Sequence, residues 1–303
     1  MASLYSNQSS NVFKTWVLMT LFLVLIVFLG WFLSLYYQSQ QILYVAFGFS
    51  LFMNFLSYWF SDKIVLSISG AKEASKEEYY DLYTSVENLA ITAGLPMPKV
   101  YVIEDPSPNA FATGRNEKHA TVAFTTGILQ ILNKTELEGV IAHELAHVKN
   151  KDILLQSVIV VLVGFVTLLS DIFVRSTFFG SNSDRDNKAG GIMVLIGIVL
   201  LILSPIVATL IQLAVSRKRE FLADATGALL TRYPEGLASA LEKISKNATP
   251  LTKANHATAH LFISDPYKER EDEQGNEKIS FFHKLFLTHP PVQERVKALL
   301  NKK

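Results

Sequence analysis

Four long apolar stretches constrain this chain more than any other feature of its sequence. They run from about Trp16 to Tyr36, Ile42 to Phe60, Ile153 to Phe173 and Ile192 to Ala214. Each is close to the roughly 20 residues that an α-helix needs to cross a bilayer. Buried helices of a large soluble core are the alternative. Only 18% of the 303 residues are charged, against roughly a quarter in an average soluble domain, so we expect four membrane-spanning helices.

The first stretch is expected to remain in the protein as an anchor. The apolar core of a cleaved signal peptide is usually about 7 to 15 residues long, and this stretch is longer. The residues that follow it, Tyr37 to Gln40, do not form a small-residue cleavage site.

Basic residues are distributed unequally around the four stretches. Lys14 precedes the first stretch, and several lysines and arginines lie between the second and the third stretch and after the fourth. The loop between the first two has none, and the segment between the last two has Arg175, Arg185 and Lys188. Because positive charge stays preferentially in the cytoplasm, we expect both termini and the large polar segments on that side.

The spans divide the chain into four parts. Residues 1–60 form an N-terminal tail and a transmembrane hairpin, 61–152 a first polar block, 153–215 a second hairpin, and 216–303 a second polar block. We expect the two polar blocks to pack together, because each carries part of the metal site described below. The net charge of +1 gives no argument for nucleic acid as a partner, and the absence of cysteine excludes thiolate chemistry and Cys-type zinc sites.

The first polar block combines helical and strand patterns. Apolar residues recur with helical spacing from Ser75 to Ala93, and short strands are predicted at Lys99–Ile103, Asn109–Thr113 and His119–Thr125. The predicted fold class is therefore mainly α with a small β-sheet (α+β).

A further helix is expected to begin near Thr135, which has the spacing of a capping box with Glu138. No Gly or Pro interrupts this helix between Val140 and Val163. We therefore expect it to continue into the third span.

That helix carries His143, Glu144 and His147 in the pattern HExxH. Histidines four residues apart lie on one face of a helix, so both rings can bind one metal ion, and Glu144 can act on a water molecule there. Two polar residues on a solvated helix face are the alternative. It fits poorly, because the flanking residues Val140–Ala142 and Leu145 are apolar and buried polar groups need partners.

A catalytic zinc site needs a third protein ligand, and Glu220 is the best candidate. Glu220 and Asp224 follow the fourth span and are four residues apart, so they share a helix face. We interpret Glu220 as the third ligand and Asp224 as the carboxylate that orients a ligating histidine. The alternative is a surface charge cluster that pairs with nearby arginines.

These motifs, with Asn150, Asp152, Arg219 and Ala223, resemble the M48 family of integral-membrane metallopeptidases, and within it the bacterial HtpX proteases. The segment Asn109–Gly114 resembles the family's segment ahead of the metal helix. Further resemblances lie at His260–Ile263 and at Thr288–Pro291 with Arg295. The resemblance covers nearly the whole chain.

The resemblance implies a thermolysin-like domain that holds one Zn²⁺ and faces the cytoplasm of a bacterial cell membrane. It also implies a role in membrane-protein quality control or stress response, with misfolded or membrane polypeptides as substrates. A His-His-Glu set can also bind other divalent ions.

The expected chemistry is peptide-bond hydrolysis with Glu144 as general base and acid. We expect the substrate to pair with an edge strand formed by Asn109, Ala110, Phe111 and Ala112, although an ordinary core strand is equally compatible. His289 has two interpretations, as a donor to the oxyanion of the transition state or as a structural residue in a Pro-rich turn. Arg295 is expected to hold its segment in place through a carboxylate.

Three other functions compete with this interpretation. A non-proteolytic scaffold with a structural zinc would normally show four protein ligands, and we find three. A transporter or channel is disfavoured because the spans hold few ionisable residues, with Asp171 the main exception. A processing protease of narrow specificity is not distinguished from a general degrader by the sequence.

Overall fold

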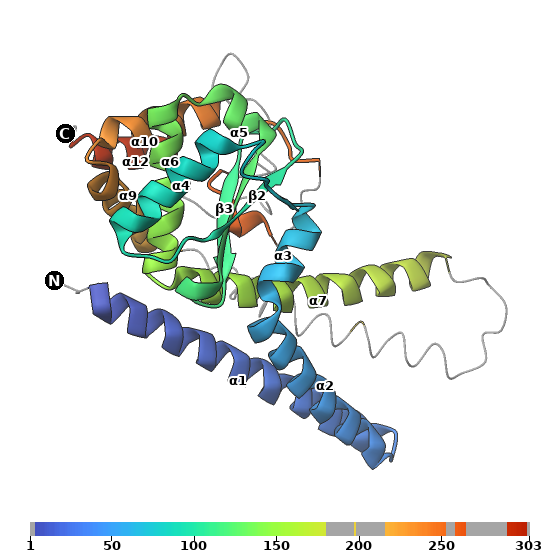
Figure 1. Cartoon of the computed structure of the whole chain (residues 1–303). Coiled ribbons are helices and arrows are strands. Elements are labelled where there is room, and N and C mark those ends of the chain that lie inside the picture. Colours follow the sequence, from blue (N-terminus) through green and yellow to red (C-terminus); the bar gives the residue numbers. More distant parts are fainter. Residues whose placement is uncertain (1–3, 180–196, 198–215, 253–257, 265–289, 302–303) are drawn as a thin grey trace.

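The computed structural model describes residues 4–179, 197, 216–252, 258–264 and 290–301 (Figure 1). The fold is mainly helical, with one small mixed sheet. Helices α1 (Leu4–Tyr36) and α2 (Gln40–Trp59) form a long hairpin that projects from the domain containing the sheet. Helix α7 (Asp152–Phe179) leaves the same domain in another direction (Figure 1).

Two helices in the described part of the chain are long and apolar enough to cross a membrane, Gln8–Tyr36 and Gln40–Trp59. A third crossing arises if the bent pair Lys134–Lys149 and Asp152–Leu168 is counted as one span. The fourth expected span, Ile192–Ala214, lies outside the described residues. The first two expected spans thus correspond to α1 and α2.

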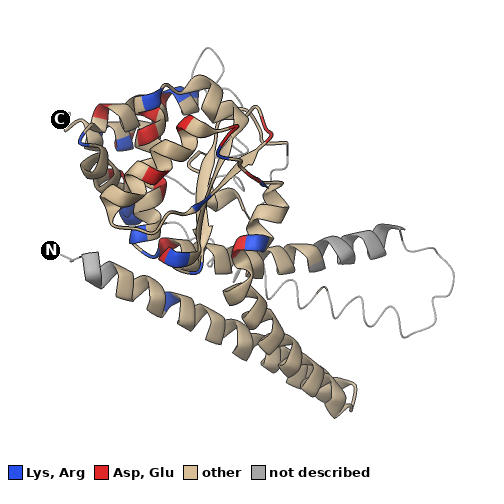
Figure 2. Ribbon diagram, viewed as in Figure 1, with Lys and Arg blue, Asp and Glu red and all other residues tan. Residues whose placement is uncertain are grey.

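The hairpin of α1 and α2 packs closely through small residues. A Cβ atom added at Gly30 would collide with Cβ of Ala46 on the facing helix. Close backbone approach at small residues is a usual means of helix association in lipid. Charged side chains are rare on this hairpin, whereas they are frequent on the domain containing the sheet (Figure 2).

The sheet has four strands in the order β1-β2-β4-β3. Strand β2 pairs in parallel with β4, and the β1–β2 and β3–β4 pairs are antiparallel. The sequence predicted β2 at its observed bounds and the other two predicted strands to within one residue. Strand β3 lies at the edge of the sheet, where it faces the metal site described below. The strands are β1 (Lys72–Glu73), β2 (Lys99–Ile103), β3 (Ala110–Gly114) and β4 (Ala120–Thr125).

Helices pack around helix α6 (Lys134–Lys149), which is buried along most of its length. Helices α4 (Tyr80–Ala93), α9 (Arg217–Thr231) and α10 (Pro234–Lys246) contact it, as does β3. Segments from both polar blocks therefore surround α6. The remaining elements are α3 (Ser61–Ser69), η1 (Glu117–His119), α5 (Thr126–Ile131), η2 (Ala259–Leu261) and α12 (Val292–Leu299).

The start of α6 differs from the expected one. Asn133, not Thr135, is the N-cap: its side chain accepts from the backbone N–H of Glu136, and the Glu136 carboxylate accepts from the N–H of Asn133. Glu136 also accepts hydrogen bonds from Ser239 and Lys243 of α10, at 2.7 and 2.8 Å. These contacts between helices favour the earlier capping box.

The expected continuous helix into the third span is wrong as well. Helix α6 ends at Lys149, and the axis turns by 84° before α7 begins at Asp152. The turn contains Lys151, whose φ of 58° is the left-handed conformation that ends helices. The break places Asp152 beside the end of α6, where it contacts the metal site.

Candidate metal centre

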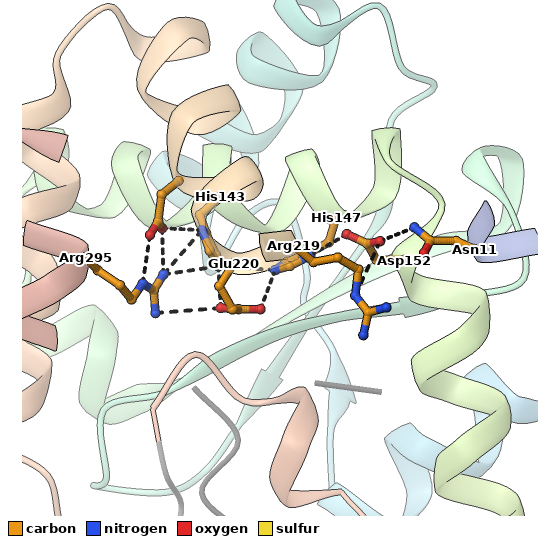
Figure 3. A network of polar contacts seen from close by, with 8 residues as sticks. Asn11, His143, His147, Asp152, Arg219, Glu220 and Arg295 are labelled. Carbon is orange, nitrogen blue, oxygen red and sulfur yellow. Dashed lines mark hydrogen bonds and ion pairs between the residues drawn. The ribbon is translucent and has the colours of Figure 1, made fainter. Parts of the chain in front are cut away.

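Three predicted ligands come together in the structure. His143 and His147 of α6 and Glu220 of α9 place one ligand atom each within 4.8 Å of one another, and all three residues are buried. The Nε2 atoms of the two histidines are 3.2 Å apart. Glu220 faces both rings, with carboxylate oxygens 3.8 Å from Nε2 of His143 and 3.6 Å from Nε2 of His147 (Figure 3).

The approach of α9 to α6 positions these groups. Both histidines lie on one face of α6 because they are four residues apart. Glu220 reaches them because α9 comes into backbone contact with α6: a Cβ atom added at Gly227 would lie 3.0 Å from the backbone nitrogen of His143. A glycine at this position allows the two helices to lie close enough for a shared site.

Each histidine ring is oriented by a carboxylate on its other nitrogen. Nδ1 of His143 lies 2.9 Å from Asp224, and Nδ1 of His147 lies 3.0 Å from Asp152. A carboxylate at Nδ1 fixes the proton there, which leaves the lone pair on Nε2. Two lone pairs that face each other across a buried space are the arrangement that a metal cation stabilises.

The donor set fits zinc in chemistry and in spacing. Two ligands about 2.0–2.1 Å from one tetrahedral ion lie roughly 3.3 Å apart, which matches the observed 3.2 Å between the Nε2 atoms. Two imidazoles and one carboxylate are also a ligand set of catalytic zinc sites, which keep the fourth position for water or substrate. The residues present therefore fit a catalytic zinc ion.

Arg295 of α12 holds the outer carboxylate of this site in place. Its Nε and Nη2 atoms donate to the two oxygens of Asp224 at 2.8 and 2.6 Å. Burial alone would raise the pKa of Asp224, but Arg295 and His143 lower it to about 2. Asp224 is therefore ionised when it faces His143, and Arg295 contacts a carboxylate as the sequence suggested.

Glu144 lies beside the ligands with an environment suited to proton transfer. Burial, and next to it the charge of Glu220, raises its pKa to about 7, although His147 and Arg295 act in the opposite direction. The backbone N–H of Ala112 on β3 also acts on this carboxylate and lowers its pKa. Glu144 thus lies between the metal ligands and the edge strand of the sheet.

A family model named peptidase family M48 matches residues 76–303, three quarters of the chain. The chain belongs to peptidase family M48. It is similar to three proteins called "Protease HtpX homolog". The protein from Caldanaerobacter subterraneus subsp. tengcongensis is 45% identical over 98% of this chain and 97% of that one. Those from Pyrococcus furiosus and Tropheryma whipplei are 46% and 49% identical, over 94% and 80% of both chains.

The crystal structure of S. mikatae Ste24p aligns with 93% of this chain and 62% of that one, with a TM-score of 0.46 and 20% identity. The family and the buried His143, His147 and Glu220 site together establish a zinc metallopeptidase with membrane helices, homologous to HtpX.

The other predicted residues of this M48 peptidase are placed as follows. Asn109 bonds the segment 258–264: its Nδ2 donates to Ser264 O at 2.9 Å, and its Oδ1 accepts from the Ser264 N–H at 3.1 Å. The Phe111 ring packs against Phe262. His289 lies outside the described residues.

Two residues of the site were not assigned roles from the sequence. In the sequence Asp152 stands out only as part of the family motif, because its contact with His147 depends on the bend after α6. Asn11 of α1 contacts Asp152 from the far end of the chain (Figure 3). Its position in a polar tail ahead of the first span gave no signal of this contact.

Proposed function

We propose that this M48 peptidase is a zinc endopeptidase that cleaves misfolded or membrane polypeptides at the cytoplasmic face of the bacterial cell membrane. The proposal rests on one observation above all. Glu144, a buried carboxyl with a pKa of about 7, lies between the His143, His147 and Glu220 cluster and the edge of a sheet. This combination provides a set of metal ligands, a base and a place for an extended chain.

Glu144 carries the proton transfers in the proposed reaction. A zinc ion held by His143, His147 and Glu220 would polarise the scissile carbonyl and lower the pKa of water to about 7. Glu144 takes a proton from the attacking water and delivers it to the leaving amine. A positioned carboxyl group can act in turn as base and as acid. Asp224 and Asp152 keep the histidine rings in orientation, and Arg295 keeps Asp224 in place.

Strand β3 is proposed to receive the substrate at Ala112. Backbone groups of β3 that point away from β4 already have partners before and after Ala112. The carbonyl of Ala110 accepts a hydrogen bond from the N–H of Ile263, and the N–H of Gly114 donates to Ser157. Because outward groups alternate along a strand, Ala112 faces the same way. The N–H of Ala112 already acts on Glu144, so its carbonyl is the group with which a substrate can pair. Asn109, Ala110 and Phe111 support the neighbouring segment in this proposal.

Several further assignments belong to the same proposal. We propose four membrane spans with both termini cytoplasmic, supported by the charge distribution around the spans. The domain division at residues 60, 152 and 215 is proposed from the positions of the apolar stretches, and a single zinc ion per chain from the one set of ligands. A role of His289 in stabilising the transition state is proposed on the family resemblance. Quality control of membrane proteins, including under stress, is the proposed cellular role.

Two alternatives remain as competing proposals. A catalytically inactive scaffold would need no buried base, so Glu144 argues against it. A processing protease with narrow specificity is compatible with the few free groups on β3, which leave little backbone for a substrate to contact.

Casein degradation by the detergent-purified protein tests the proposed activity. The protein is assayed as purified, after chelation, after chelation and zinc return, and as Glu144→Gln. Activity that disappears on chelation, returns with zinc and is absent in Glu144→Gln supports the proposal. Activity that survives chelation or the substitution contradicts it, and zinc binding without any hydrolysis of casein or other unfolded proteins favours the scaffold.

A further inference from the structure

The N-terminal helix α1 reaches the metal site through one buried side chain. Asn11 is 3% exposed, and its Nδ2 atom donates to Oδ1 of Asp152 at 2.5 Å and to the backbone carbonyl of Asn150 at 3.2 Å. Both partners are acceptors only, so the amide nitrogen, with its two protons, must face them. The side chain of Asn11 is therefore fixed in one orientation.

Asp152 connects this amide to a metal ligand. Its Oδ1 accepts from Asn11, while Oδ2 lies 3.0 Å from Nδ1 of His147 (Figure 3). Asp152 is 1% exposed and is the first residue of α7. A buried carboxylate whose two oxygens are both engaged has little rotational freedom, so the orientation of His147 depends on what holds Oδ1.

Among the described residues, Arg219 also lies near Oδ1, but at a longer distance than Asn11. Nε of Arg219 lies 3.8 Å from Oδ1 of Asp152, which is beyond hydrogen-bond distance. Asn11 supplies the short hydrogen bond at this oxygen. A membrane helix thus completes the hydrogen-bond chain that ends at His147.

We propose that Asn11 is a positioning residue, through which α1 fixes Asp152 and thereby the ring of His147 for metal binding. The inference rests on the proposed zinc site. Loss of a group that orients a metal-bound histidine typically costs 10–100-fold in metal affinity or activity. Asp152→Asn should therefore weaken zinc binding about 10–100-fold. Asn11 acts one step further away, so a several-fold loss is expected.

The decisive variant is Asn11→Asp, which keeps the volume of the side chain and replaces the donor by an acceptor. It places two carboxylates opposite each other and should weaken zinc binding about tenfold or more. In the double variant Asn11→Asp with Asp152→Asn, the amide at 152 can donate to residue 11 and accept from His147. This double variant should bind zinc more tightly than either single variant. If the role of Asn11 is purely structural, the losses of zinc affinity in the two single variants should instead add.

Gln8→Ala is the matched control. Gln8 lies one helical turn before Asn11 and donates to the backbone carbonyl of Lys149 at 2.6 Å. It fastens the same helix to the same end of α6 without contacting Asp152. If Asn11 only attaches α1 to the domain, Gln8→Ala and Asn11→Asp should have similar effects.

The experiment measures zinc affinity of the full-length protein in detergent by competition with a chromophoric chelator. The absorption spectrum of the cobalt-substituted protein reports on ligand geometry. We expect Gln8→Ala to bind zinc within twofold of the wild type, Asn11→Asp to bind it more weakly with an altered cobalt spectrum, and the double variant to recover part of the loss.

Wild-type affinity and spectrum in Asn11→Asp, or a double variant no better than the single ones, overturns the inference. If Asn11→Asp does not fold, the smaller Asn11→Ser, which keeps one donor, replaces it in the same comparison, and zinc binding equal to that of Gln8→Ala overturns the inference. Failure of the wild type to bind zinc would instead contradict the proposed function.

Discussion

Gly227 is the position at which a single methyl group should change the metal site. A Cβ atom there would lie 3.0 Å from the backbone nitrogen of His143 and 3.2 Å from its Cα. Favourable contacts between heavy atoms lie at about 3.5–4.0 Å, so Gly227→Ala must move α9 away from α6 by a few tenths of an ångström. Because Glu220 lies on α9 and the histidines lie on α6, this movement separates the ligands.

Two opposing effects decide the magnitude for Gly227→Ala. Overpacking of a core costs about 1–3 kcal/mol, whereas alanine is preferred over glycine inside a helix by about 1 kcal/mol. The net cost is therefore about 0–2 kcal/mol. Metal sites tolerate ligand displacements of only about 0.2 Å, so we expect the strain to appear in the site. Since about 1.4 kcal/mol corresponds to a factor of ten, a net cost of up to about 2 kcal/mol weakens zinc binding by up to about 30-fold.

The assay is chelator competition in detergent, combined with kcat/KM on casein and thermal unfolding of the metal-free protein. Ala225→Ser is the control, because Ala225 is exposed on the same helix. We expect weaker zinc binding and lower kcat/KM in Gly227→Ala, with a small change in the melting temperature of the metal-free protein. Wild-type zinc affinity together with wild-type kcat/KM would refute the reasoning, since the helices would then accommodate the methyl group without moving Glu220.

Three further predictions concern charges and topology. Burial alone would raise the pKa of Glu136, but hydrogen bonds with Lys243, Ser239 and the Asn133 backbone lower it. This charge therefore adds stability at pH values above about 4.5 that is lost as the pH falls through the folded-state pKa. Glu136→Gln should lower the free energy of unfolding by about 1 kcal/mol at pH 7. In thermal unfolding at several pH values, the difference in melting temperature from the wild type should shrink in acid. A difference that does not change with pH would contradict the assignment. Arg295→Met leaves the buried carboxylate of Asp224 without its arginine partner and should lower the free energy of unfolding by about 3–5 kcal/mol. The loss is measured as a lower melting temperature. An unchanged melting temperature would show that the pair does not stabilise the fold. A reporter fused at Lys303 should be active in the cytoplasm, and activity outside it would reverse the proposed orientation.

Local patterns in the sequence predicted the parts of the site that depend on spacing. His143 and His147 share a helix face because they are four residues apart, and Glu220 was identified by its position after an apolar span. Strand β2 was predicted at its observed bounds because its residues alternate between apolar and polar. In each case the decisive signal lies within a few residues.

Contacts between distant segments explain the errors. Asn133 with Glu136 and Thr135 with Glu138 have the same capping spacing, and the bonds from α10 to Glu136 favour the first pair. The break after α6 contains no Gly or Pro, yet Lys151 adopts a positive φ. Local sequence propensities could not predict this break, because the distant residue Asn11 donates hydrogen bonds to Asn150 and Asp152 on either side of it.

The bonds from Gln8 and Asn11 to the end of α6 join positions 141 and 139 residues apart in the chain. Helix α1 is thus synthesised long before the helices that carry the metal ligands, yet it completes their site. A protein cut after α2 would lack both bonds and should hold its metal less firmly, even though α7 remains in the fragment. The N-terminal hairpin would then act as a safeguard, because a peptidase that has lost α1 and α2 loses part of the support of its metal site.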